Sequence, residues 1–148
     1  MPISTVRKVC AALFRTFLAS LWWHFIAVIF GAPIFEKVLE TYLFAVLLSV
    51  CSVLPTSLCL DSYEDFGRLY FDFDWEQSWE LSLLYTSLGS VVGAWVGAFP
   101  IPLDWDRPWQ EWPITCVVGT LLGCILGYLC SKLHLSWVRH RGRKSKIV

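Results

Sequence analysis

The segment from Pro100 to Pro113 carries the residues best suited to bind a charged ligand. Its four prolines restrict the backbone, and its three tryptophans supply rigid amphipathic surface. An arginine fork binds phosphate oxygens and carboxylates bind an ammonium group, so this loop could hold a phosphoethanolamine or sugar-phosphate head group. The candidate contact residues are Asp104, Trp105, Asp106, Arg107 and Trp109, with Glu111 as a further acid. In the alternative interpretation, Arg107 pairs with a neighbouring aspartate and the tryptophans only anchor the loop.

The same loop holds no serine, histidine or lysine, and therefore no nucleophile beside a general base. Asp104 and Asp106 could in principle exchange protons, but two carboxylates two residues apart do not establish that role. The six cysteines form no CxxC pair, and the three histidines lack the spacing of metal ligands. We therefore predict no catalytic residue, no metal site and no cofactor for this chain.

Two rows of glycine recur at every fourth residue. The rows are Gly89, Gly93 and Gly97, and Gly119, Gly123 and Gly127. On a helix this spacing places each row along one face, and in lipid such a face lets two backbones approach closely. We predict that the two segments pack tightly, against each other or against a partner. The alternative explanation is that glycine is frequent in transmembrane helices in any case.

These residues require membrane-spanning helices to position them. Of the 148 residues 56% are hydrophobic and 16% charged, and the mean hydropathy of +0.56 is too high for an ordinary soluble domain. A helix needs about 20 apolar residues to cross a bilayer core. The segments free of Asp, Glu, Lys and Arg are 16–33, 41–60, 81–99 and 114–131. We predict an all-α integral membrane protein, a single transmembrane domain over residues 1–148 with about four spans, the last two packed along their glycine rows.

The charges outside these segments predict the orientation. With four spans, the N-terminus, the middle loop and the C-terminus share one side, which holds all Lys and Arg except Lys37 and Arg107. Because cytosolic loops carry the excess of basic residues, both termini and the basic tail at 132–148 are predicted to be cytosolic. The middle loop, 61–80, contains seven acids and seven aromatics. It is predicted to form either a short amphipathic helix on the membrane, with Phe66, Leu69, Tyr70 and Phe73 on one face, or a disordered acidic connector. The net charge of zero gives no indication of nucleic acid.

The last residues are Lys144-Ser-Lys-Ile-Val148. Lys144 and Lys146 resemble the dilysine retrieval signals of endoplasmic reticulum membrane proteins, which are read on the cytosolic side. The charge distribution independently places the tail there. A basic tail after a last span is expected for topology alone, so the pattern is supporting evidence only.

Two segments resemble the PIG-F family of glycosylphosphatidylinositol (GPI) anchor synthesis. They read GAPIFEKVLETYLFAVLLS from Gly31 and VGAWVGAFPIPLDWDRPWQEWPITC from Val92, and the resemblance extends over most of 22–131. It implies an endoplasmic reticulum protein that stabilises the enzymes transferring ethanolamine phosphate from phosphatidylethanolamine to mannoses of the GPI precursor. The metal-dependent catalytic domain would belong to the partners, PIG-O and PIG-G. Family members usually have further spans before the region matching Leu21, so the resemblance also implies a short form.

Two functional hypotheses follow. In the first, the chain is a non-catalytic membrane subunit of a GPI ethanolamine phosphate transferase, in contact with membrane lipid. In the second, it is a small lipid transporter or membrane enzyme acting alone, with the loop from Asp104 to Glu111 as its site.

Overall fold

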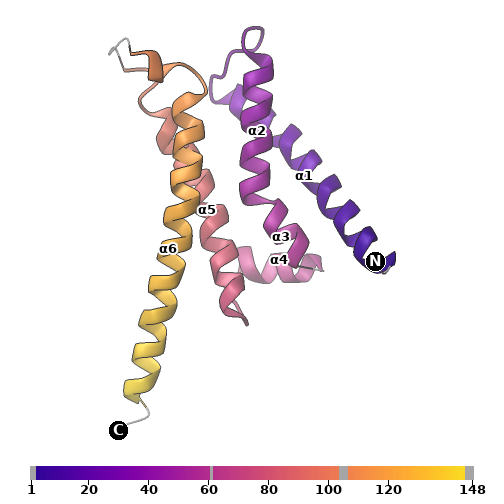
Figure 1. Cartoon of the computed structure of the whole chain (residues 1–148), viewed down its shortest axis with the longest axis vertical. Coiled ribbons are helices and arrows are strands. Elements are labelled where there is room, and N and C mark those ends of the chain that lie inside the picture. Colours follow the sequence, from indigo (N-terminus) through magenta and orange to yellow (C-terminus); the bar gives the residue numbers. More distant parts are fainter. Residues whose placement is uncertain (1–2, 61, 104–106, 146–148) are drawn as a thin grey trace.

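The computed structural model describes residues 3–60, 62–103 and 107–145, which form six α-helices and one short 3₁₀ helix (Figure 1). The elements are α1 (Ile3–Ile29), α2 (Val38–Ser52), α3 (Leu54–Cys59), α4 (Tyr63–Tyr70), α5 (Ser78–Ala98), η1 (Pro108–Gln110) and α6 (Ile114–Ser145). Helices α5 and α6 run antiparallel as one pair, and α1 runs beside α2 and α3 as the other. The prediction of an all-α protein is confirmed, since the described residues contain no strand.

Helix α1 is long enough to cross a membrane. Its 27 residues correspond to about 40 Å, and it begins well before the predicted start at residue 16. It ends in a paired turn: the N–H of Ala32 donates to the carbonyl of Ala27, and the N–H of Gly31 to that of Val28, both at 3.0 Å. Gly31 has a φ of 101°, a conformation that glycine adopts without a Cβ clash. This turn sends the chain back along α1 as α2.

The second predicted span is interrupted at Val53, between α2 and α3. Pro55 lies in the first turn of α3, and a proline has no N–H to donate and clashes with the carbonyl four residues earlier. A continuous helix over 41–60 therefore does not form. Within the described residues, α1, α5 and α6 are the helices long and apolar enough to cross a membrane, so the count of four spans stays a prediction.

The middle loop contains the short helix α4. Ser62 caps it, because its Oγ accepts from the N–H of Glu64 while its own N–H donates to Asp65 Oδ2, each at 3.2 Å. Leu69 is fully buried and packs against two leucines from outside α4, Leu60 and Leu84. The amphipathic helix therefore turns its apolar face towards α3 and α5. Phe73, expected on that face, lies beyond the helix and is exposed.

Helices α5 and α6 extend beyond the predicted spans. Helix α5 covers 78–98, and α6 continues without a break past residue 131. The predicted basic tail is thus helical as far as residue 145. Lys144 lies in the last turn of α6, of which only the backbone is described, and Lys146 lies outside the described residues.

Small polar side chains occupy much of the interior, and large apolar side chains face outwards. The buried hydroxyl residues are Thr16, Ser20, Thr41, Ser49, Ser52, Thr56, Ser57, Ser82, Ser87, Ser90, Thr120 and Ser131. Phe25, Trp95 and Leu126 are each more than half exposed. In water such a surface would be unfavourable, whereas helices in lipid associate through small residues and leave their large apolar side chains to the acyl chains. This distribution supports a membrane protein.

Candidate functional site

The loop between α5 and α6 is held together by Gln110, which sequence reasoning did not single out. Its side chain is buried, and its Nε2 donates to the carbonyls of Pro100 and Leu103, both at 2.7 Å. Its Oε1 accepts from the N–H of Arg107 at 2.9 Å. One amide thus satisfies three backbone groups of the loop. The sequence offered one signal for this role, because Gln110 is an uncharged polar residue in a segment whose four prolines have no N–H to donate.

The same loop is attached to α2 through Trp112. Its indole Nε1 donates to Thr41 Oγ1 at 2.9 Å, and its ring meets Phe44 edge-on with 5.7 Å between centroids. Thr41 is fully buried, and its hydroxyl in turn donates to the carbonyl of Lys37 at 2.9 Å. The loop therefore contacts both helix pairs.

An ion pair joins the two loops at this end of the molecule. Lys37 lies in the short loop before α2, and Glu111 lies in the long loop before α6. The ammonium of Lys37 contacts the carboxylate of Glu111. This hydrogen bond and the lysine charge lower the pKa of Glu111 below its ordinary value. Glu111 remains largely exposed, so the pair orients the loops more than it stabilises them.

The predicted head-group residues are only partly within the described chain. Asp104, Trp105 and Asp106 lie outside the described residues. Arg107 directly precedes η1, and Trp109 is the middle residue of η1. Both are exposed. Glu111 contacts Lys37, which sequence reasoning had not paired with it. Whether Arg107 pairs with a neighbouring aspartate stays a prediction.

The two glycine rows face each other across α5 and α6, along a line we call the glycine seam. A Cβ added to Gly93 would overlap the carbonyl oxygen of Gly119, and one added to Gly89 would overlap that of Gly123. The outer glycines meet backbone as well, Gly97 at Thr115 and Gly127 at Tyr85. The seam therefore consists of direct backbone contact over several helical turns, which no residue with a Cβ permits at these positions.

Polar side chains continue the contact between α5 and α6 beyond the glycine seam, towards the start of α5. Ser131 Oγ donates to Ser82 Oγ at 3.0 Å, and Lys132 Nζ lies 3.4 Å from the same oxygen. The hydroxyl of Tyr85 lies 2.9 Å from Nδ1 of His134. His134 also contacts Trp75 and Trp137, so this histidine is held by aromatic neighbours. No pattern in the sequence had joined these residues.

A charge cluster connects α4 to the start of α5. Glu80 is 4% exposed, and its carboxylate accepts from Arg68 Nη2 at 3.0 Å and from the N–H groups of Glu76 and Gln77 at 2.7 and 3.1 Å. The hydrogen bond to Glu80 is the main cause that raises the pKa of Arg68. These bonds compensate the burial of the Glu80 charge, so the cluster is explained as a structural one.

Within the described ranges no three His, Cys, Asp or Glu side chains are grouped closely enough to hold a metal ion. All six cysteines are free thiols.

The apolar helices, the outward-facing large side chains and the glycine seam define a multi-pass α-helical membrane protein. Residues 2–132 match the family model described as GPI biosynthesis protein family Pig-F. The chain belongs to the PIG-F family.

The chain is similar to curated proteins from animals and fungi. A GPI ethanolamine phosphate transferase, stabilizing subunit, from Mus musculus is 47% identical over 118 residues, which are 78% of this chain and 53% of that protein. The Homo sapiens protein of the same name is 45% identical over 79% of this chain and 54% of its own length. A PIGF/3-ketodihydrosphingosine reductase fusion protein of Schizosaccharomyces pombe is 40% identical over 82% of this chain and 24% of the fusion protein. The chain thus spans about half the length of the two mammalian relatives. No solved structure matches it.

Proposed function

We propose that this chain is a non-catalytic membrane subunit that stabilises GPI ethanolamine phosphate transferases. The observation that carries the proposal is the 45–47% identity to two mammalian proteins named as stabilizing subunits of such a transferase. The family match over residues 2–132 supports a role in GPI biosynthesis. The catalytic partners would be PIG-O and PIG-G, as the resemblance implies.

The loop before α6 is the surface we propose for partner contact. Gln110, Trp112 and the Lys37–Glu111 pair hold the described residues 107–113 of this loop, so that part needs little ordering on binding. Trp109 is 45% exposed, and a partly exposed tryptophan on an ordered turn is a typical anchor of an interface. Asp104, Trp105, Asp106 and Arg107 adjoin it in the sequence.

The cellular location is proposed on the charge distribution and the family. GPI synthesis and the lysines at 144 and 146 support the endoplasmic reticulum membrane, with both termini in the cytosol. In that orientation the loop before α6 faces the lumen.

Removal of the chain from cells tests the proposal. The partner's abundance should fall, GPI precursors should lack their terminal ethanolamine phosphate, and anchored proteins should be lost from the cell surface. The tagged chain should also co-purify in mild detergent with a partner that carries a large lumenal domain. Purification of the chain without such a partner would instead support a transporter or enzyme acting alone.

The acidic residues of the loop distinguish support from chemistry. Asp104→Asn with Asp106→Asn should leave both partner abundance and transfer nearly unchanged, because anchoring requires polarity more than charge. Normal partner abundance combined with abolished transfer would contradict the proposal and would assign the loop a direct part in substrate binding or catalysis.

A further inference from the structure

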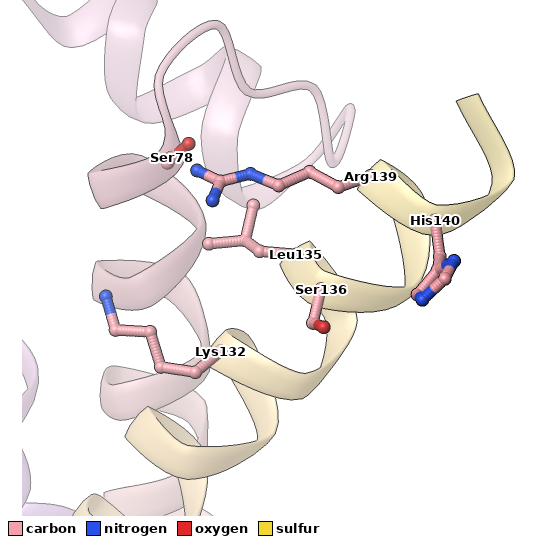
Figure 2. A pocket seen from close by; sticks show the side chains of 6 residues that line it. All are labelled: Ser78, Lys132, Leu135, Ser136, Arg139 and His140. Carbon is pink, nitrogen blue, oxygen red and sulfur yellow. The ribbon is translucent and has the colours of Figure 1, made fainter. Parts of the chain in front are cut away.

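A hollow of about 630 Å³ lies between the start of α5 and the second half of α6. Its lining residues are Ser78, Lys132, Leu135, Ser136, Arg139 and His140. Figure 2 shows Arg139 and Lys132 extending from α6 towards α5, Arg139 reaching Ser78, with Leu135 between them. His140 points away from α5 in the same view. The hollow is thus bounded by two cations and a hydroxyl at the first residue of α5.

The positive charge in this hollow is not neutralised within the described part of the chain. Among the described residues, the carboxylates in ion pairs contact Arg68 or Lys37, and no salt bridge involves Lys132 or Arg139. Lys132 contacts two groups without net charge: Ser82 Oγ at 3.4 Å and the ring face of Tyr128, 4.7 Å from its centroid. Both cations therefore remain available to an anion.

A second hollow, of about 250 Å³, shares Lys132 with the first. Side chains from α2, α3, α5 and α6 line it, among them Cys51, Pro55, Leu83 and Tyr128, and most of its lining surface is apolar. Along α5 it reaches Thr86, about 12 Å into the helix from its first residue. An apolar hollow therefore begins where the cationic hollow ends, and it extends into the depth of the spans.

The two hollows meet where the apolar stretches of α5 and α6 end. Ser78 is the first residue of α5, and Lys132 directly follows the uncharged stretch of α6. We therefore expect this junction at the level of the lipid head groups, where tryptophans such as Trp79, which lines the apolar hollow, are enriched. The cationic hollow suits the phosphate of a phospholipid, and the apolar hollow beside it suits an acyl chain.

We propose that the joined hollows bind one phospholipid with a net negative head group. Its phosphate lies between Lys132 and Arg139, where a guanidinium fork and an ammonium both donate to phosphate oxygens. One acyl chain fills the hollow along Leu83 and Tyr128, which restores dispersion contacts that an empty hollow lacks. A soluble phosphate would occupy the cationic hollow alone, so the apolar hollow below Lys132 favours a lipid. The site lies at the opposite end of α5 and α6 from the loop proposed for partner contact and does not depend on that proposal.

Lipid retention by the full chain tests the site. The protein is placed in nanodiscs of phosphatidylcholine with a minor fraction of phosphatidic acid, then released for native mass spectrometry. Wild type should retain one phosphatidic acid in preference to phosphatidylcholine. Arg139→Gln should lower this preference about fivefold, and the double variant with Lys132→Gln about 30-fold. Arg7→Gln, which removes an exposed cation on α1, should leave the preference unchanged.

A variant of the apolar hollow and a competition experiment identify the occupant. Leu83→Trp, which fills the hollow without a change in charge, should reduce retention of phosphatidic acid. Inorganic phosphate should not displace the lipid. Equal retention of both lipids by wild type would overturn the proposal, as would an unchanged preference in Arg139→Gln, whose exposed side chain is not needed for folding. Displacement by inorganic phosphate, with no effect of Leu83→Trp, would show a soluble anion site instead of a lipid site.

Discussion

In the loop before α6, the side chain of Gln110 bonds to three backbone groups. Four prolines leave the segment with few N–H donors, and the amide of Gln110 provides donors to two of its carbonyls. Backbone groups without partners are costly when buried, so these bonds stabilise the described residues on both sides of the turn, 100–103 and 107–110. Trp112 and Glu111 add contacts to α2 and to the loop before it.

Gln110→Leu should destabilise the protein by about 1–3 kcal/mol, because two carbonyls and one N–H lose their partner. The loop should also become accessible to chymotrypsin at Trp109 and Trp112. Thermal unfolding in detergent and limited proteolysis measure the two effects. Glu36→Gln, an exposed substitution in the neighbouring loop, should behave as wild type. Equal protease resistance of Gln110→Leu and wild type would contradict this role.

The Lys37–Glu111 pair should make stability depend on acid pH. The pKa of Glu111 is lower in the folded protein than its ordinary value of 4.5. The stabilisation is therefore present above the unfolded pKa and is lost as the pH falls through the lowered folded pKa. Glu111→Gln should show a smaller loss of melting temperature than wild type between about pH 6 and about pH 3. The effect should be small and decrease with salt, because Glu111 is exposed. A Glu111→Gln variant with the full acid sensitivity of wild type would show that other groups cause it.

At the scale of the elements, the glycine seam explains why α5 and α6 form the most extensively packed pair of helices. Gly89 lies opposite Gly123, and Gly93 lies opposite Gly119, because the two helices are antiparallel. A side chain added at any of these glycines would therefore have to displace the backbone of the facing helix. The other pair differs, because α2 is interrupted before Pro55 and α1 contacts both α2 and α3.

Gly93→Ala and Gly123→Ala should each destabilise the pair by about 1–3 kcal/mol, because the added Cβ meets a carbonyl that cannot move alone. Gly93→Leu and Gly123→Leu should also reduce recovery of the partner complex, more than Leu121→Ala does. Steric trapping in bicelles measures the stability, and detergent co-purification measures the complex. Gly67→Ala is the matched control, since nothing lies within 4 Å of its added Cβ. The seam would have no special role if Gly93→Ala and Gly67→Ala were equally stable.

At the scale of the whole molecule, the two ends of the helices differ in chemistry. One end carries Lys37, Arg107 and the loop before α6, and the other carries Arg7, Lys8, Lys132 and Arg139 together with the charge cluster of α4 (Figure 1). The positive-inside rule relates this asymmetry to orientation. In the proposed orientation, the lipid site would lie in the cytosolic leaflet and the partner surface would face the lumen.

Glycosylation mapping should place the loop before α6 in the lumen. The chain has no asparagine, so every glycan would report on an engineered acceptor. An acceptor in a lengthened 100–113 loop should be glycosylated, because added residues move it away from the membrane, and an acceptor after residue 145 should not be. Glycan addition at the C-terminal end would mean the opposite orientation.

The sequence by itself determined the helical membrane class and the two glycine rows, and it showed the high proline content of the Pro100–Pro113 segment. The length of an apolar segment, the four-residue spacing of glycines and the proline content are local properties, and each can be read from a single segment of the chain. Pro55 was also visible as a helix breaker, but the uniform hydropathy of 41–60 concealed the interruption at Val53.

Only the tertiary structure decided which residues meet. Trp112 donates a hydrogen bond to Thr41, which lies 71 positions away in the sequence, and Lys37 donates one to Glu111, 74 positions away. Gly93 faces Gly119 because of the length and shape of the loop between α5 and α6, to which Gln110 contributes. Lys132 lies between a cationic and an apolar hollow because α2 and α3 pack beside that pair. Such contacts depend on the path of the whole chain and on packing in three dimensions, and no local pattern of residue types encodes them.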